Sequence, residues 1–352
     1  MPEAREARQI ADLRARIDGA KLCARASRVR GGVPCKTDRS QESITFDDGV
    51  TWLARFRLAK VASPPLAARD YILQSEVATM MFLHTRTRVP VPKVFDWSAE
   101  SDPENDIGLG GILMEKLPGK PLDWQTLTAQ QKEKVMQQLA DLFLEMENHP
   151  FESVGSLMSS GSEDTGFEVQ GIAHHSTFNM TEQSKQPLGP FASSAEAAHD
   201  VFLAHRFRLD VIDGIWEGQQ RQERFYLKHP DDKGDHILVD EAFNVVGVID
   251  WEWTRTVSKE EAFSSPCMMW PVARFYEGSN ELSDDEVRFA DMFRERGRPD
   301  LAACVMEGRK VQRFYFALGP SSGAHGSRET FMDLFAGLRR AVGFEEEAWG
   351  SD

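Results

Sequence analysis

Three side chains that can do chemistry stand close together in residues 229–253, namely Asp231, His236 and Asp250. Carboxylates bind hard cations and transfer protons, and an imidazole titrates near neutral pH. Carboxylates and an imidazole in one place therefore predict a metal site or an acid–base site, provided that the fold brings the three groups together.

The local pattern predicts a β-hairpin that would do this. Residues 237–239 are an apolar strand, residues 240–244 form a polar turn, and residues 245–249 are a second apolar strand. A strand, a tight turn and a returning strand bring the two ends of the segment together. We therefore expect Asp250 to lie beside His236, with Asp231 on the loop just before the hairpin.

The charge of these carboxylates needs compensation. The neighbouring sequence offers no obvious lysine or arginine partner, and a buried carboxylate without a partner is strongly destabilising. A divalent cation would supply the missing charge. The alternative is that the acids are solvated turn residues that cap the hairpin, and the spacing alone leaves both interpretations open.

Strand and helix signals alternate before this segment. Residues 44–58 predict a hairpin around the turn Asp47-Asp48-Gly49, with Trp52 and Ala54 on one face and Arg55 and Arg57 on the other. A helix is expected from Ser75, its proposed N-cap, to a point before Pro90. Residues 110–117 form a second apolar strand that runs into Pro118-Gly119.

From about residue 116 the pattern becomes mainly helical. Capping boxes are expected at Thr128 with Gln131 and at Ser283 with Glu286, and two further helices are expected over roughly 300–318 and 327–342. Residues 150–195 are rich in Ser, Gly and Thr and predict a long loop or insertion.

The composition excludes several classes of function. The chain has 352 residues, a net charge of −15 and 41% hydrophobic residues, so it can form two packed lobes but has no general attraction to nucleic acid or anionic lipid. We expect no nucleic-acid or membrane partner. The expected substrate is a small molecule, and the negative charge of the protein would suit a cationic one. The four scattered cysteines predict a cytoplasmic protein with no disulfide framework.

The segment around Asp231 resembles the family of phosphotransferases that includes aminoglycoside and choline kinases, and most closely its fungal branch. His229-Pro230-Asp231 is similar to the start of the family's catalytic loop, and Ile249-Asp250-Trp251-Glu252 to the close of its strand pair. The resemblance implies an α+β, two-lobed, protein-kinase-like fold. Residues 1–115 would form a small β-rich N-lobe that binds nucleotide, and residues 116–352 a larger helical C-lobe with catalytic loop 229–236 and metal-binding hairpin 237–250.

The resemblance also implies ATP and Mg²⁺ as cofactors and a role for each matched residue. Asp231, on the loop that His229 opens, would orient the substrate hydroxyl, and Asp250 would hold the metal. The implied nucleotide-binding residues are Arg55 and Gly32 at the phosphates, Glu76 as the partner of Arg55, and Glu115 and Leu117 at adenine. The expected reaction is transfer of the γ-phosphoryl group to a hydroxyl of a small molecule.

His236 departs from the family pattern, which has asparagine at this position as a magnesium ligand. Asp235 or Asp232 can replace that ligand, or His236 itself can bind a softer ion such as Mn²⁺. Alternatively, the chain is a pseudokinase that only binds its ligands. In a third reading His236 is a general acid or base in a repurposed site.

Overall fold

The computed structural model describes residues 2–38, 43–57, 63–160, 166–173, 207, 211, 224–317 and 328–344. The chain forms two compact units, each built from several segments. Unit 1 contains Met1–Leu122, Gly155–Asn179 and His236–Arg255, and unit 2 contains Asp123–Val154, Met180–Asp235 and Thr256–Asp352. The lobe boundary expected between residues 115 and 116 stays a prediction.

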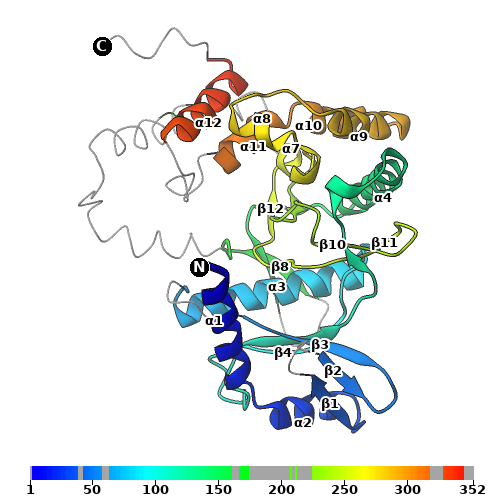
Figure 1. Cartoon of the computed structure of the whole chain (residues 1–352), viewed down its shortest axis with the longest axis vertical. Helices are drawn as coiled ribbons and strands as arrows, with labels where there is room; N and C mark the ends of the chain where they lie inside the picture. Colours follow the sequence, from blue (N-terminus) through cyan, green and yellow to red (C-terminus); the bar gives the residue numbers. More distant parts are fainter. Residues whose placement is uncertain are drawn as a thin grey trace, which may run out of the picture. The chain divides into compact units, whose positions relative to one another are not determined.

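Unit 1 is organised around a five-stranded antiparallel sheet with the order β1-β2-β3-β5-β4 (Figure 1). The strands are β1 (Cys35–Asp38), β2 (Ser43–Phe46), β3 (Thr51–Phe56), β4 (Val94–Ser98) and β5 (Gly111–Glu115). Ile44 pairs with Trp52 across the expected β2–β3 hairpin. Ile44, Phe46, Trp52 and Ala54 are buried in one core, which leaves Arg55 on the opposite face of β3, as the alternation predicts.

Three helices belong to the same unit: α1 (Pro2–Arg16), α2 (Gly19–Val29) and α3 (Leu66–Arg86). The expected start of the third helix is wrong. Helix α3 begins ten residues earlier, with Pro65 at the N-cap position, and Ser75 is a buried interior residue. Proline has a fixed φ that suits the start of a helix, and it needs no side-chain cap there. The start of α3 is therefore set at Pro65 and not at Ser75.

Two smaller sheets complete unit 1. The hairpin predicted between His236 and Asp250 is present as β10 (Ile237–Val239) and β11 (Val245–Val248), and β6 (Lys120–Pro121) pairs with the other edge of β10. Residues 156–159 and 167–170 form a further hairpin, β7 (Ser156–Ser159) and β8 (Phe167–Gln170). The expectation of a long loop over 150–195 is therefore wrong for this stretch, whereas residues 174–195 lie outside the described residues.

Unit 2 is mainly helical. Its elements are η1 (Trp124–Thr126), α4 (Ala129–Glu147), β9 (Tyr226–Lys228), β12 (Arg255–Val257), α7 (Lys259–Ala262), η2 (Cys267–Met269), α8 (Val272–Tyr276), α9 (Asp284–Glu295), α10 (Pro299–Met306), α11 (Arg309–Gln312), the π-helical turn η3 (Arg313–Ala317) and α12 (Arg328–Ala341). Both expected capping boxes are present, at Thr128 and at Ser283. None of the helices that the structure describes is long and apolar enough to cross a membrane.

Candidate active site

Arg55 is the centre of an ion-pair cluster in unit 1. From β3, its guanidinium contacts Glu76 of α3 through Nη1. Through Nη2 it donates to Oδ1 of Asp250 at 2.6 Å and to Oε2 of Glu252 at 3.4 Å. One arginine therefore joins the sheet, the helix and the end of the β10–β11 hairpin.

A second arginine, Arg57, lies on the same face of β3 and pairs with Glu252. Burial, and then the positive charge of Arg55, lower the pKa of Arg57 to about 10, so it is still a cation at neutral pH. We call these five residues the Arg55 cluster: Arg55, Arg57, Glu76, Asp250 and Glu252. The cluster carries two positive and three negative formal charges.

The three acids of the Arg55 cluster differ in their access to solvent. The side chain of Glu76 is 5% exposed and that of Glu252 is 15% exposed, whereas that of Asp250 is 50% exposed. Because Glu76 is buried against Arg55, it acts as a fixed counter-charge. Asp250 is the carboxylate of the cluster that a ligand can reach.

The hairpin places Asp250 where the sequence predicts. Ile237 pairs with Val248, and the N–H of Ile249 donates to the carbonyl of His236 at 2.9 Å, so the two ends of the hairpin are adjacent. Asp250 itself has a φ of 65°, a left-handed conformation that Asp and Asn adopt more readily than most residues. The neighbouring sequence offers Asp250 no basic partner, and the compensating charge comes instead from Arg55, 195 positions away in the chain.

The segment after β5 is fixed by close packing. The N–H of Glu115 donates to the carbonyl of Lys93 at 2.9 Å, so this amide is already engaged. A Cβ on Gly247 would lie 2.7 Å from Cδ1 of Leu117, and one on Gly119 would lie 2.8 Å from the carbonyl oxygen of Val239. Residues 117–119 therefore lie directly on the β10–β11 hairpin. The adenine contacts of Glu115 and Leu117 stay predictions.

The loop that carries Asp231 belongs to unit 2 and follows β9. Oδ1 of Asp231 accepts the N–H of Lys233 at 3.4 Å and lies 3.5 Å from its Nζ. Asp232 pairs instead with Lys228 at 3.3 Å. His229 is buried at 9% exposure, whereas the side chain of Asp231 is 33% exposed. The side chain of Asp232 is 21% exposed, so Asp231 is the more accessible of the two adjacent acids.

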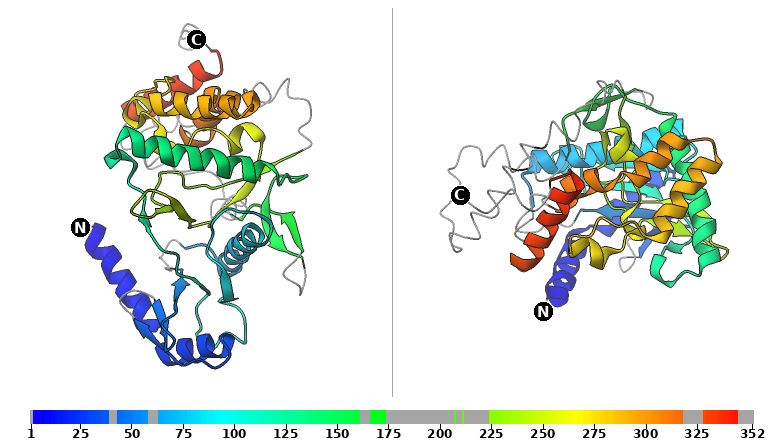
Figure 2. Two further views of the ribbon diagram at one scale, coloured as in Figure 1. Left: turned by 90° about the vertical axis from the view of Figure 1, so that its right-hand side faces the viewer. Right: turned by 90° about the horizontal axis from the view of Figure 1, so that it is seen from above.

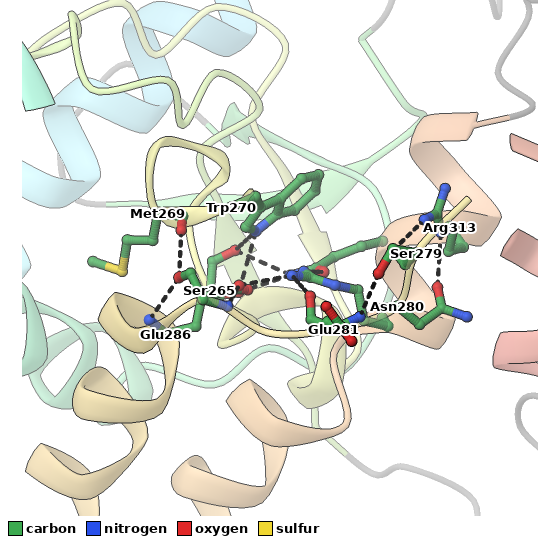
Figure 3. A network of polar contacts seen from close by, with 11 residues as sticks. Ser265, Met269, Trp270, Ser279, Asn280, Glu281, Glu286 and Arg313 are labelled. Carbon is green, nitrogen blue, oxygen red and sulfur yellow. Dashed lines mark hydrogen bonds and ion pairs between the residues drawn. The ribbon is translucent and has the colours of Figure 1, made fainter. Parts of the chain in front are cut away.

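A buried polar network supports this loop from within unit 2 (Figure 3). Glu286 is fully buried; its Oε1 accepts from Ser265 at 2.6 Å and its Oε2 from Arg309 at 2.7 Å. The same segment reaches the loop, because the N–H of Met268 donates to the carbonyl of Asp232 at 3.0 Å. The carboxylate of Glu286 is thus paired through both of its oxygens, which anchors this segment beneath the loop.

The sequence model of the phosphotransferase enzyme family matches residues 47–255, more than half of the chain, and this range contains the whole Arg55 cluster and Asp231. The chain belongs to the phosphotransferase enzyme family. The resemblance seen around Asp231 and Asp250 is thereby confirmed at the level of the family.

Curated relatives of this phosphotransferase-family chain match only in part. A subtelomeric hrmA-associated cluster protein of Aspergillus fumigatus is 36% identical over 102 residues, which are 28% of this chain and 20% of that protein. Altered inheritance of mitochondria protein 9, mitochondrial, of Zygosaccharomyces rouxii is 29% identical over 209 residues, 53% of this chain and 33% of that protein. The matches thus span a third or less of these relatives' length.

Solved structures confirm the fold expected for the family. A candidate aminoglycoside phosphotransferase from Ralstonia eutropha superposes with a TM-score of 0.51 at 15% identity, over 93% of this chain and 96% of that chain. An ethanolamine kinase of Plasmodium vivax gives 0.52 at 10% identity, over 85% and 77%. The chain therefore has the predicted α+β kinase-like fold, with a β-rich N-terminal part and a helical C-terminal part.

The acidic side chains of the Arg55 cluster suit a Mg²⁺ ion that is bound jointly by the protein and by substrate phosphates. Within the described ranges, no three His, Cys, Asp or Glu side chains are placed to hold a metal ion among themselves. Mg²⁺ is commonly bound by one or two carboxylates together with substrate phosphates and water. The half-exposed carboxylate of Asp250 suits that arrangement. His236 is 8% exposed, and its metal role stays a prediction.

Gly32 has a structural task in the family fold. With a φ of 92°, it follows α2 and donates its N–H to the carbonyl of Ser27 at 2.8 Å, a helix ending that favours glycine. This amide is therefore engaged, and the geometry gives no support to a phosphate contact through it. The proposed role of Gly32 stays untested.

The pair of Arg57 and Glu252 is the part of the cluster that the sequence interpretation missed. Two signals pointed to it. The alternation in β3 placed Arg57 on the same face as Arg55, and Glu252 stands two residues after Asp250. Two basic and two acidic residues at the same spacing, on segments that both lead to one site, indicate paired charges.

We expect Arg55 and Glu76 to be energetically coupled. Removing Arg55 leaves the buried carboxylate of Glu76 without its cation, whereas removing both charges does not. In a double-mutant cycle with Arg55→Met and Glu76→Gln, the coupling measured by chemical denaturation should be about 1–3 kcal/mol. Additive single-mutant effects would show that this ion pair does not join β3 to α3.

Proposed function

We propose that the chain is an ATP-dependent phosphotransferase that moves the γ-phosphoryl group to a hydroxyl of a small molecule. The observation that carries this proposal is the Arg55 cluster, in which one strand arginine contacts a helix glutamate and the aspartate at the end of a hairpin. This charge arrangement suits nucleotide phosphates and their metal ion, and it occurs in a chain of the phosphotransferase family.

In this proposal Glu76 holds the guanidinium of Arg55 in place, and Arg55 contacts the nucleotide phosphates. A phosphate oxygen would replace Asp250 as the acceptor of the hydrogen bond from Nη2 of Arg55. Asp250, thus released and half exposed, would hold Mg²⁺, which neutralises phosphate charge when bound. Asp231 would accept the hydrogen bond of the acceptor hydroxyl and orient it for attack.

The acceptor class is proposed from charge and from relatives. The chain carries a net charge of −15, which attracts small cations, and similar folds include an ethanolamine kinase. We therefore propose hydroxyl compounds that carry an amine as the first acceptors to test. The cytoplasmic location stays a prediction. One relative is named as a mitochondrial protein, so cell fractionation should compare the cytosolic and mitochondrial fractions.

Nucleotide binding tests the proposal first. Titration calorimetry with ATP should show binding that needs Mg²⁺ or Mn²⁺, because the phosphates and Asp250 would share the ion. Matched runs with ATP plus EDTA should lose most of the heat. Absence of nucleotide binding with either ion would contradict the proposal.

His236 supports a second candidate function, in which the residues at the open end of the β10–β11 hairpin perform acid–base chemistry without phosphoryl transfer. The residue is buried at the entry of the hairpin, next to Asp250. If the chain is a phosphotransferase, His236→Asn supplies an oxygen ligand and should raise magnesium-dependent ATP hydrolysis by several-fold, with no new pH dependence. If His236 is the acid or base, the same variant should abolish activity.

A further inference from the structure

The β7–β8 hairpin is an element of unit 1 to which the proposed reaction assigns no role. Its strands pair from Ser156 with Gln170 to Ser159 with Phe167, and Ser156 and Leu157 are fully buried. An isolated two-stranded hairpin is only marginally stable in water. The hairpin must therefore be held by what it packs against, and it can hold those elements in return.

One of these elements is α3, the helix that carries Glu76, and Figure 2 shows the hairpin beside it. Met158 and Ala173 form a buried cluster with Ile72, and Oη of Tyr71 donates to the carbonyl of Gly171 at 3.0 Å. Further along the helix, Phe82 meets Phe167 edge to face, with ring centroids 5.5 Å apart. These contacts lie on both sides of Glu76 along α3.

The other element is the segment that carries Asp250 and Glu252. Oγ of Ser156 donates to the carbonyl of Thr254 at 3.0 Å and accepts the N–H of Ala173 at 3.0 Å. Trp253, partly buried, packs against the cluster of Ile72 and Met158. The buried hydroxyl of Ser156 thus links the hairpin to the residues directly after the two acids.

We infer that the β7–β8 hairpin positions the acidic partners of Arg55 for nucleotide binding, with Ser156 and Met158 as positioning residues. The hairpin contacts both α3 and residues 253–254. If it loosens, Glu76 and Asp250 lose their fixed separation, and Arg55 can no longer satisfy both. The predicted effect of the hairpin on nucleotide affinity rests on the proposed function. The predicted effect on the stability of α3 does not.

The test compares two methionine truncations. Met158→Ala removes the side chain of the hairpin that packs on α3, and Met292→Ala removes a fully buried methionine of α9 in unit 2. Both create a cavity, and both should lower the melting temperature. Hydrogen exchange then reads the opening of α3 without nucleotide, and calorimetry reads the affinity for ATP with Mg²⁺.

Met158→Ala should speed exchange of the α3 amides near Glu76 and weaken nucleotide binding, each by about tenfold or more, whereas Met292→Ala should change neither. Tyr71→Phe, which removes one hydroxyl and cannot prevent folding, should change both in the same direction by a smaller factor. Unchanged α3 exchange in Met158→Ala and Tyr71→Phe overturns the inference. If the wild type binds no nucleotide, the proposed function fails while the exchange comparison still decides whether the hairpin braces the helix.

Discussion

Replacing Asp231 by asparagine is expected to lower turnover by roughly 10²–10⁴-fold, the range for loss of a positioned general base. Asparagine keeps the size of the side chain and can still accept the N–H of Lys233, so the loop should keep its shape. Nucleotide affinity should change little, because the proposed phosphate contacts belong to Arg55. Initial rates at saturating ATP, together with calorimetry, separate the two effects.

The neighbouring acid provides the matched control. Asp232→Asn makes the same chemical change one residue away, on a carboxylate that pairs with Lys228. It should leave turnover within a few-fold of the wild type, because Asp232 is engaged by Lys228 and has no part in the proposed transfer. If Asp232→Asn shows the large loss and Asp231→Asn does not, the catalytic role moves to Asp232.

Replacing Asp250 by asparagine should abolish metal-dependent nucleotide binding and leave the fold intact. The variant removes the negative charge that would share Mg²⁺ with the phosphates. Asparagine is chosen because the φ of 65° at this position would strain alanine more than asparagine. Calorimetry should show at least about a hundredfold weaker binding of ATP with Mg²⁺, a loss of about 2.8 kcal/mol of binding free energy.

Glu241→Gln is the control for this variant. Glu241 is an exposed acid in the turn at the opposite end of the same hairpin, so its loss changes the net charge equally without touching the Arg55 cluster. It should bind nucleotide as the wild type does. Unchanged affinity in a folded Asp250→Asn variant would remove Asp250 from the metal site.

Local patterns predicted the parts of the fold that depend on neighbouring residues. The β10–β11 hairpin, the β2–β3 hairpin and the two capping boxes were all found where the sequence indicated them. Each is set by alternation, by a turn or by a side chain that caps a nearby amide. The adjacency of His236 and Asp250 followed from the same kind of short-range reasoning.

Contacts between distant segments were not predictable in this way. The ion pair of Arg55 with Asp250 joins residues 195 positions apart, and no local pattern indicates that a strand arginine will reach a hairpin aspartate. The β7–β8 hairpin was missed for a related reason. Its strands are only four residues long, and they are stabilised by packing on α3 and on residues 253–254 rather than by strand propensity.

The most direct test of the central claim is transfer of label from γ-labelled ATP to a small molecule. The purified chain would be incubated with the labelled nucleotide, Mg²⁺ or Mn²⁺, and a panel of hydroxyl compounds with and without an amine. We expect wild-type protein to place label on at least one acceptor, and Asp231→Asn to leave that acceptor unlabelled at the same nucleotide occupancy. Nucleotide binding with no labelled acceptor in the wild type, or equal labelling by both proteins, would contradict a phosphotransferase built on Asp231 and the Arg55 cluster.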